Sequence, residues 1–209
     1  MDNAAKTPEI AGSECEAVAE KRVAPRFTLL IRAAKLISGQ GEFVCVIRDV
    51  SETGVSVRLF HDLPSGETLE LHMPGGGSYE IRNVWHRGNE AGFEFTHSVD
   101  VARLIDEAGE YPRRGLRVGL FIPVKVSTLS QTCDGFIENL SQQGARIECD
   151  GLFAIDQGLQ ISGEDFKEVR AKVRWRRDNQ CGVVFDDTFT LGDFARLVAR
   201  LQAPVLLTD

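Results

Sequence analysis

The sequence predicts a mainly β protein built from two tandem small antiparallel β-barrels, each ending in a helix. The first observation behind this fold class is a pattern that recurs with an offset of 90 residues. The second is the apolar period of two within each copy, which is typical of half-buried strands. The third is a helical apolar stripe at the end of each copy.

The repeat is clearest around the only two tryptophans of the chain, Trp85 and Trp175, which lie 90 residues apart. Gly92 and Gly182 follow them at the same offset. Two long copies indicate tandem domains, because a solenoid stacks a larger number of short repeats.

These copies divide the chain into four parts. We predict one domain at 21–108 and a second at 109–203, followed by a short C-terminal tail at 204–209. Residues 1–20 carry five acids against one lysine and have no apolar periodicity. Such a composition predicts a disordered acidic tail.

Apolar residues at every second position predict the strands of both barrels. In the first copy these are Phe43, Cys45 and Ile47, then Val55, Val57 and Leu59, then Leu69, Leu71 and Met73, then Phe93 and Phe95; in the second they are Ile122, Val124 and Val126, then Val169, Ala171 and Val173. Turn residues separate these short runs, which favours an antiparallel sheet closed or nearly closed into a barrel.

A spacing of i, i+3, i+4 and i+7 predicts the helix that ends each copy. Its apolar positions are Val101, Leu104, Ile105 and Ala108 in the first copy, and Phe194, Leu197, Val198 and Leu201 in the second. Ser98 is the predicted N-cap of the first helix. We expect each helix to cover the open end or edge of its own barrel.

Composition narrows the class of partner. A formal net charge of −7 argues against duplex DNA, which is bound through lysine and arginine contacts to phosphate. No apolar run approaches the roughly 18 residues of a membrane-spanning helix, and no secretory signal is visible. We therefore expect a cytoplasmic protein without membrane insertion, whose five cysteines are reduced and bind no metal.

Two polar motifs occur in the same order in both copies. One is Arg-x-x-x-Arg and the other is Asp/Asn-x-Ser-x-x-Gly. Their residues are Arg22, Arg26, Asp49, Ser51 and Gly54 in the first copy, and Arg113, Arg117, Asn139, Ser141 and Gly144 in the second. Either motif alone is typical of a solvated surface or a turn. Their joint repetition predicts one binding site in each domain.

The chemistry of these residues suits a guanine nucleotide that carries phosphates. An arginine guanidinium can bind guanine O6 and N7 together, or form a fork with phosphate oxygens. Asp49 can accept from the guanine N1–H and N2–H groups, and Ser51 adds a small donor and acceptor. Gly54 would either adopt a positive φ or let a ligand approach the backbone.

This combination of motifs on a small barrel with a C-terminal helix resembles the PilZ family, whose members are bacterial receptors for cyclic diguanylate (c-di-GMP). The resemblance covers residues 21–108 and 110–202 and includes every signature position. It implies that the Arg-x-x-x-Arg arm closes over a ligand held on the Asp/Asn-Ser-Gly surface. It also implies a receptor that signals to a downstream protein partner, typically in motility or biofilm control. The sequence itself has no nucleophile elbow, no H-E-x-x-H and no cysteine or histidine spacing typical of a metal site, so we expect a protein that is not an enzyme and needs no cofactor or metal.

Several alternatives stay open. The main one is a PilZ-like adaptor for protein interaction in which one or both sites bind no nucleotide. An oligonucleotide-binding barrel would need a basic, aromatic-rich groove, and the aromatic content is only 8%. For Trp85 and Trp175 we expect packing in the core or in the barrel wall, with ligand stacking as the alternative.

The two sites are also expected to differ. We expect the first to bind more tightly, because Asp49 offers a carboxylate where Asn139 offers an uncharged carbonyl. The second arm lies in the predicted connection between the domains, so a ligand bound there could fix the angle between the barrels.

Overall fold

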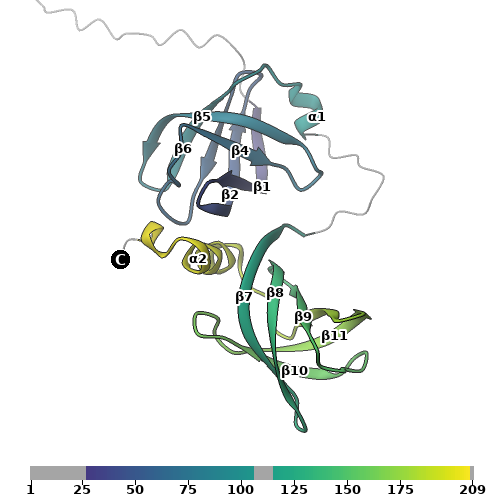
Figure 1. The fold of residues 1–209 in the computed structure, drawn as a ribbon. Helices are drawn as coiled ribbons and strands as arrows, with labels where there is room; N and C mark the ends of the chain where they lie inside the picture. Colours follow the sequence, from purple (N-terminus) through teal and green to yellow (C-terminus); the bar gives the residue numbers. More distant parts are fainter. Residues whose placement is uncertain (1–26, 106–114, 208–209) are drawn as a thin grey trace, which may run out of the picture.

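The computed structural model describes residues 27–105 and 115–207 as two closed six-stranded antiparallel barrels (Figure 1), which confirms the predicted fold class. The predicted acidic tail at 1–20 lies outside the described residues. None of the helices within the described ranges is long and apolar enough to cross a membrane.

The first barrel arranges its strands in the order β1-β2-β3-β6-β5-β4, and pairing of β4 with β1 closes it. Its elements are β1 (Phe27–Ser38), β2 (Gly41–Val50), β3 (Gly54–Arg58), β4 (Thr68–His72), β5 (Ser78–Arg87), β6 (Glu90–Phe95) and the short helix α1 (Val101–Ile105). The apolar positions named from the sequence lie in these strands or, for Leu59 and Met73, directly after one, and their side chains are buried in one core.

The second barrel has the equivalent order β10-β11-β12-β9-β8-β7, with β10 paired to β7. Its elements are β7 (Arg117–Ser127), β8 (Thr132–Ser141), β9 (Gly144–Cys149), β10 (Gly158–Ser162), β11 (Val169–Arg177), β12 (Gln180–Phe185), α2 (Leu191–Gln202) and the 3-10 helix η1 (Pro204–Leu206). Buried and exposed residues alternate strictly along β7, as the period of two predicts.

The helix caps correct one detail of the sequence analysis. The carboxylate of Asp100, rather than Ser98, accepts hydrogen bonds from the backbone N–H groups of Ala102 and Arg103, at 2.9 and 3.2 Å. Asp100 is the residue directly before the helix, so only its side chain has the N-cap position. Thr190 caps α2 in the same way by accepting from Asp193 N at 3.1 Å.

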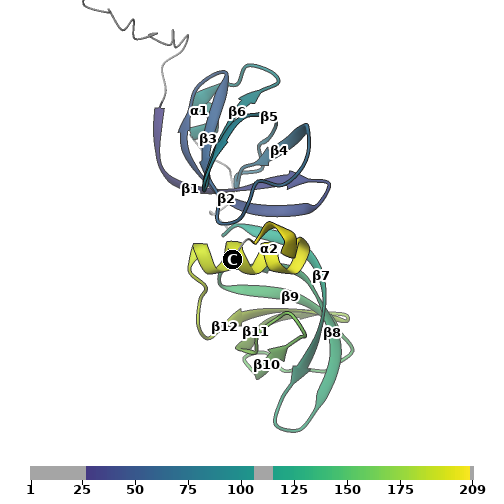
Figure 2. The ribbon, with the colours of Figure 1, turned by 90° about the vertical axis from the view of Figure 1, so that its left-hand side faces the viewer.

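The helix α2 does not cover only its own barrel, as the sequence analysis expected. It lies between the two barrels (Figures 1 and 2). Phe194 and Val198 pack in the core of the second barrel, whereas Ala199 and, beyond the helix, Leu206 pack in the core of the first. Because apolar residues lie on two sides of the helix, it buries one side against each barrel.

Hydrogen bonds reinforce this contact at Glu42, near the start of β2. The Gln202 side chain accepts from Glu42 N at 3.0 Å and donates to Glu42 O at 2.6 Å. The Glu42 carboxylate accepts from Gly119 N of the second barrel at 2.9 Å and from Lys35 Nζ at 2.8 Å. We call this group the Glu42 clasp, because it joins β1, β2, β7 and α2.

Replacement of Leu206 by alanine should destabilise the first barrel, although Leu206 follows the helix of the second. Loss of such a buried leucine costs about 2–5 kcal/mol in the free energy of unfolding. Denaturant unfolding measures the change, with Val205→Ala as the matched control, since Val205 is 77% exposed. Equal midpoints for the two variants would contradict the shared core.

Candidate functional site

The Ser and Gly of the second motif shape a tight corner between two strands of each barrel. Ser51 N donates to Gly54 O at 2.8 Å, and Gly54 N donates to Ser51 Oγ at 3.1 Å. In the second barrel Ser141 Oγ donates to Gly144 O at 3.0 Å. Both serines are buried, so their hydroxyls hold the corner together.

The motif glycines are needed because a neighbouring strand lies unusually close. A methyl group at Gly54 would come within 2.9 Å of Phe93 O, and one at Gly144 would overlap Val183 O. Neither glycine has a positive φ. Of the two alternatives given for Gly54, a positive φ is therefore excluded. The backbones of β6 and β12 occupy the space that a side chain would take.

The acceptor of each motif lies two residues before the buried serine. Asn139 Oδ1 accepts a hydrogen bond from Arg117 Nη1 at 3.1 Å, so the second domain brings one arm arginine and its motif together. The strand register is consistent with this hydrogen bond, because Arg117 on β7 pairs with Ser141 on β8, two residues from Asn139. In the first domain Asp49 Oδ2 accepts from Ser56 Oγ at 3.2 Å.

The remaining arm residues, Arg22, Arg26 and Arg113, lie outside the described residues. The residue that follows the first arm is described, because β1 begins there. Phe27, which follows Arg26, pairs with Val50, the residue before Ser51.

A pocket lies at each motif. The one in the second domain has a volume of ≈ 350 Å³ and the one in the first ≈ 170 Å³. The second is lined among others by Arg117, Ser141, Gly144, Arg174 and Trp175, and the first by Asp49, Gly54, Ser56 and Trp85. A hollow of ≈ 410 Å³ beside α1 contains none of the motif residues.

The two tryptophans line these pockets. The sequence analysis preferred packing for them and did not predict this position. Trp85 is 36% exposed and Trp175 is 41% exposed, too much for core residues. Each pairs with a glycine on the next strand, Gly92 or Gly182, where a methyl group would overlap the indole. The constant spacing from tryptophan to glycine in both copies is the sequence signal that marks this arrangement.

The second pocket carries positive charge and no carboxylate among its lining residues. Arg117 and Arg174 both line it. Arg174 also pairs with Asp156, at 3.0 Å. The surface thus suits an anion with an aromatic face more than a metal ion, and within the described residues no group of three or more His, Cys, Asp or Glu could hold a metal.

A match to the PilZ domain family covers the chain twice, at residues 20–107 and 110–203. This protein belongs to the PilZ family. PilZ proteins are a family of c-di-GMP receptors and are generally not enzymes.

Solved structures that are similar to this chain include PlzA and YcgR. The PlzA protein of Borreliella burgdorferi in complex with c-di-GMP is 14% identical, with 82% of this chain and 88% of that chain covered and a TM-score of 0.35. YcgR of Escherichia coli in complex with c-di-GMP is 10% identical, with 83% and 81% covered and a TM-score of 0.29. Comparison with curated proteins gives no match.

Replacement of Gly144 by alanine should deform the corner of the second PilZ domain, because the new methyl group would collide with Val183 O. Overpacking of this kind costs about 1–3 kcal/mol in the free energy of unfolding. Gly158→Ala is the matched control, since nothing lies within 4 Å of the added methyl group. Thermal unfolding measures the melting temperatures of both variants, and that of Gly144→Ala should be the lower one. Equal melting temperatures would contradict the steric role of Gly144.

Proposed function

We propose that this tandem PilZ protein is a non-enzymatic receptor for c-di-GMP with one site in each domain. The proposed ligand-binding residues are Arg22, Arg26, Asp49, Ser51 and Gly54 in the first domain, and Arg113, Arg117, Asn139, Ser141 and Gly144 in the second. The observation that carries the proposal is the Arg117–Asn139 hydrogen bond at the rim of the second pocket. This bond holds a guanidinium beside an amide, and Arg117 lines the pocket together with the partly exposed indole of Trp175.

Each group has a chemical role toward a cyclic dinucleotide. The guanidinium of Arg117 can leave Asn139 and bind guanine O6 and N7 or a phosphate. The Asn139 carbonyl is then free to accept from a guanine N–H group. Trp175 offers an aromatic face on which a purine can stack.

The two sites should have different affinities. The first domain supplies the Asp49 carboxylate, and hydrogen bonds to an ionised acceptor are stronger than those to a neutral one. The second supplies Asn139 but has the larger pocket, ≈ 350 against ≈ 170 Å³. We expect the charge to dominate and the first site to bind more tightly.

Isothermal titration calorimetry with c-di-GMP tests the proposal on the wild type and on the double variants Arg22→Ala/Arg26→Ala and Arg113→Ala/Arg117→Ala. Each double variant should weaken one binding phase, and the first variant should weaken the tighter one. A single bidentate arginine contact contributes about 1–3 kcal/mol, so affinity at that site should fall by roughly tenfold or more.

Arg82→Ala is the matched control, since Arg82 is an exposed arginine of β5 that lines neither motif pocket. It should leave both phases intact. Absence of heat with the wild type, together with no competition in a second assay, would overturn the receptor and favour the protein-interaction adaptor.

Arg117 also suggests how binding could reach the other domain. It lines a second hollow of ≈ 310 Å³ between the barrels, together with Lys35, His72 and Leu116. Two residues later, Gly119 pairs with Asn139 and donates to the Glu42 clasp. We propose that a ligand which repositions Arg117 changes how firmly the clasp holds the barrels.

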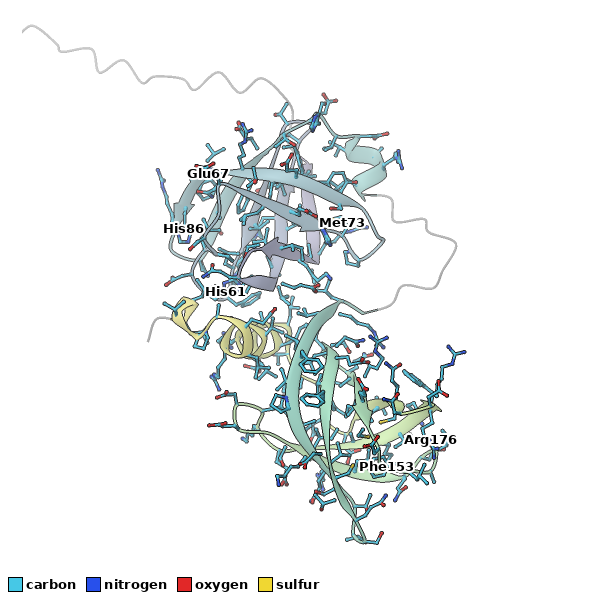
Figure 3. All side chains as sticks on the ribbon, in the orientation of Figure 1. His61, Glu67, Met73, His86, Phe153 and Arg176 are labelled. Carbon is cyan, nitrogen blue, oxygen red and sulfur yellow. The ribbon has the colours of Figure 1, made fainter. Side chains whose placement is uncertain are left out.

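Small-angle X-ray scattering measures this coupling. With the wild type, c-di-GMP should change the radius of gyration, because the ligand acts beside the clasp. Glu42→Ala should make the ligand-free protein more extended and reduce the change on binding. Glu67→Ala, which removes an exposed carboxylate that takes no part in the clasp (labelled in Figure 3), is the control. Identical scattering with and without ligand would contradict the coupling.

A further inference from the structure

Three cysteines of the second barrel gather at one end of its interior. Cys133, Cys149 and Cys181 belong to the adjacent strands β8, β9 and β12. The register places them together, since Cys149 pairs with Gly135, two residues from Cys133, and Cys181 pairs with Ile147, two residues from Cys149. We call these three residues the thiol cluster.

The thiols of the cluster interact with one another. The polar neighbours that act on Cys149 are the side chains of Cys181 and Cys133 and the backbone of Gly151. Cys149 is thus the centre of the cluster, with a thiol on either side. The fourth described cysteine, Cys45, has no thiol partner among the residues that the structure describes, and its Sγ donates to Ala34 O at 3.6 Å.

The first barrel shows that the fold itself needs no sulfur here. At the offset of 90 residues, the positions of Cys133, Cys149 and Cys181 are occupied by Phe43, Leu59 and Ala91. All three are buried in the core of the first barrel. Apolar side chains therefore satisfy the same barrel geometry, and the three thiols are a property of the second domain alone.

The cluster lies close to the surface at this end of the barrel. Cys133 is only partly buried, whereas Cys149 is 6% and Cys181 is 2% exposed. Phe153 packs beside it against Gly151, and Arg176 Nη1 donates to Phe153 O at 3.2 Å, so a cation lies at the same end (Figure 3). A small oxidant would meet the cluster from the side of Cys133.

These surroundings favour a thiolate at the centre of the cluster. Donation from Cys181, the largest cause, together with the bonds from Gly151 and Cys133, lowers the pKa of Cys149 to about 6. Burial raises the pKa of Cys133 to about 11, and sharing its proton with Cys149 raises the pKa of Cys181. By contrast, complete burial raises the pKa of Cys45 to about 12. Thiolates are the nucleophilic form of cysteine.

We propose that the thiol cluster is an oxidation site in which Cys149 reacts with a hydroperoxide and then forms a disulfide with a neighbouring cysteine of the cluster. The Cys149 thiolate attacks the O–O bond, forming an S–O bond, and the leaving oxygen takes up a proton. The second thiol then forms the S–S bond, and its proton leaves with the hydroxyl group as water. In total two thiols lose two hydrogens, and hydrogen peroxide becomes two waters.

The test uses the reduced full-length protein and hydrogen peroxide, followed by alkylation after unfolding and peptide mass mapping. We expect a cross-link between Cys149 and either Cys181 or Cys133, with a mass loss of about 2 Da, while Cys45 remains alkylated. The rate should rise with pH, pass half of its maximum near the Cys149 pKa of about 6, and level off only well above that pH, where the thiolate fraction of Cys149 is complete.

Matched variants separate this chemistry from folding. Cys149→Leu and Cys181→Ala introduce the residues that the first barrel carries, and Cys149→Ser is the smaller change. Both Cys149 variants should lose the cross-link and react at least about tenfold more slowly, whereas Cys45→Val should react as the wild type does. Thermal unfolding checks that each variant is folded. A Cys149 that stays reduced, or is oxidised without forming a disulfide, would overturn the proposal.

Discussion

The close approach of two neighbouring strands governs the shape of both candidate sites. At the corner of the second domain the backbone of β12 lies so near β9 that Gly144 has no room for a side chain, and on β12 itself Gly182 leaves room for the Trp175 indole. The two glycines thus create a concave surface with an aromatic wall on the outside of a barrel whose interior is filled. Ser141 then fixes the corner, and Asn139 and Arg117 are among the polar groups beside it.

The contact through α2 makes the stability of each domain depend on the other domain. A helix that completes one barrel also contributes Ala199 to the core of the other, and the chain beyond it contributes Leu206. Unfolding of either barrel therefore exposes apolar surface on both. The polar Glu42 clasp sits at the edge of this apolar contact, where a change of hydrogen-bond partners costs less than repacking the core would.

The fold followed from the sequence because strand burial has a period of two and the repeat provides two independent readings of it. The position of the helix between the barrels was not predictable. The apolar stripe of Phe194, Leu197 and Val198 indicates that one side of the helix is buried, but it does not indicate which barrel buries that side.

The site was predictable in part. Arg117, Asn139 and Ser141 do lie together, but Trp175 was assigned to packing, because a single aromatic residue in a strand pattern gives no sign of the bulge between Val173 and Trp175 that accompanies its exposure.

The two copies also act as controls for each other. Positions that the barrel itself requires, such as Ser51 and Ser141 or Gly54 and Gly144, are identical in both domains, and each has a steric or hydrogen-bonding reason. Positions that differ are those where the fold leaves a choice. The exchange of Asp49 for Asn139 changes the charge at the site without changing the corner. Likewise the exchange of Phe43, Leu59 and Ala91 for three cysteines keeps the core closed while adding chemistry to one barrel, because cysteine packs as a small apolar residue until it is oxidised.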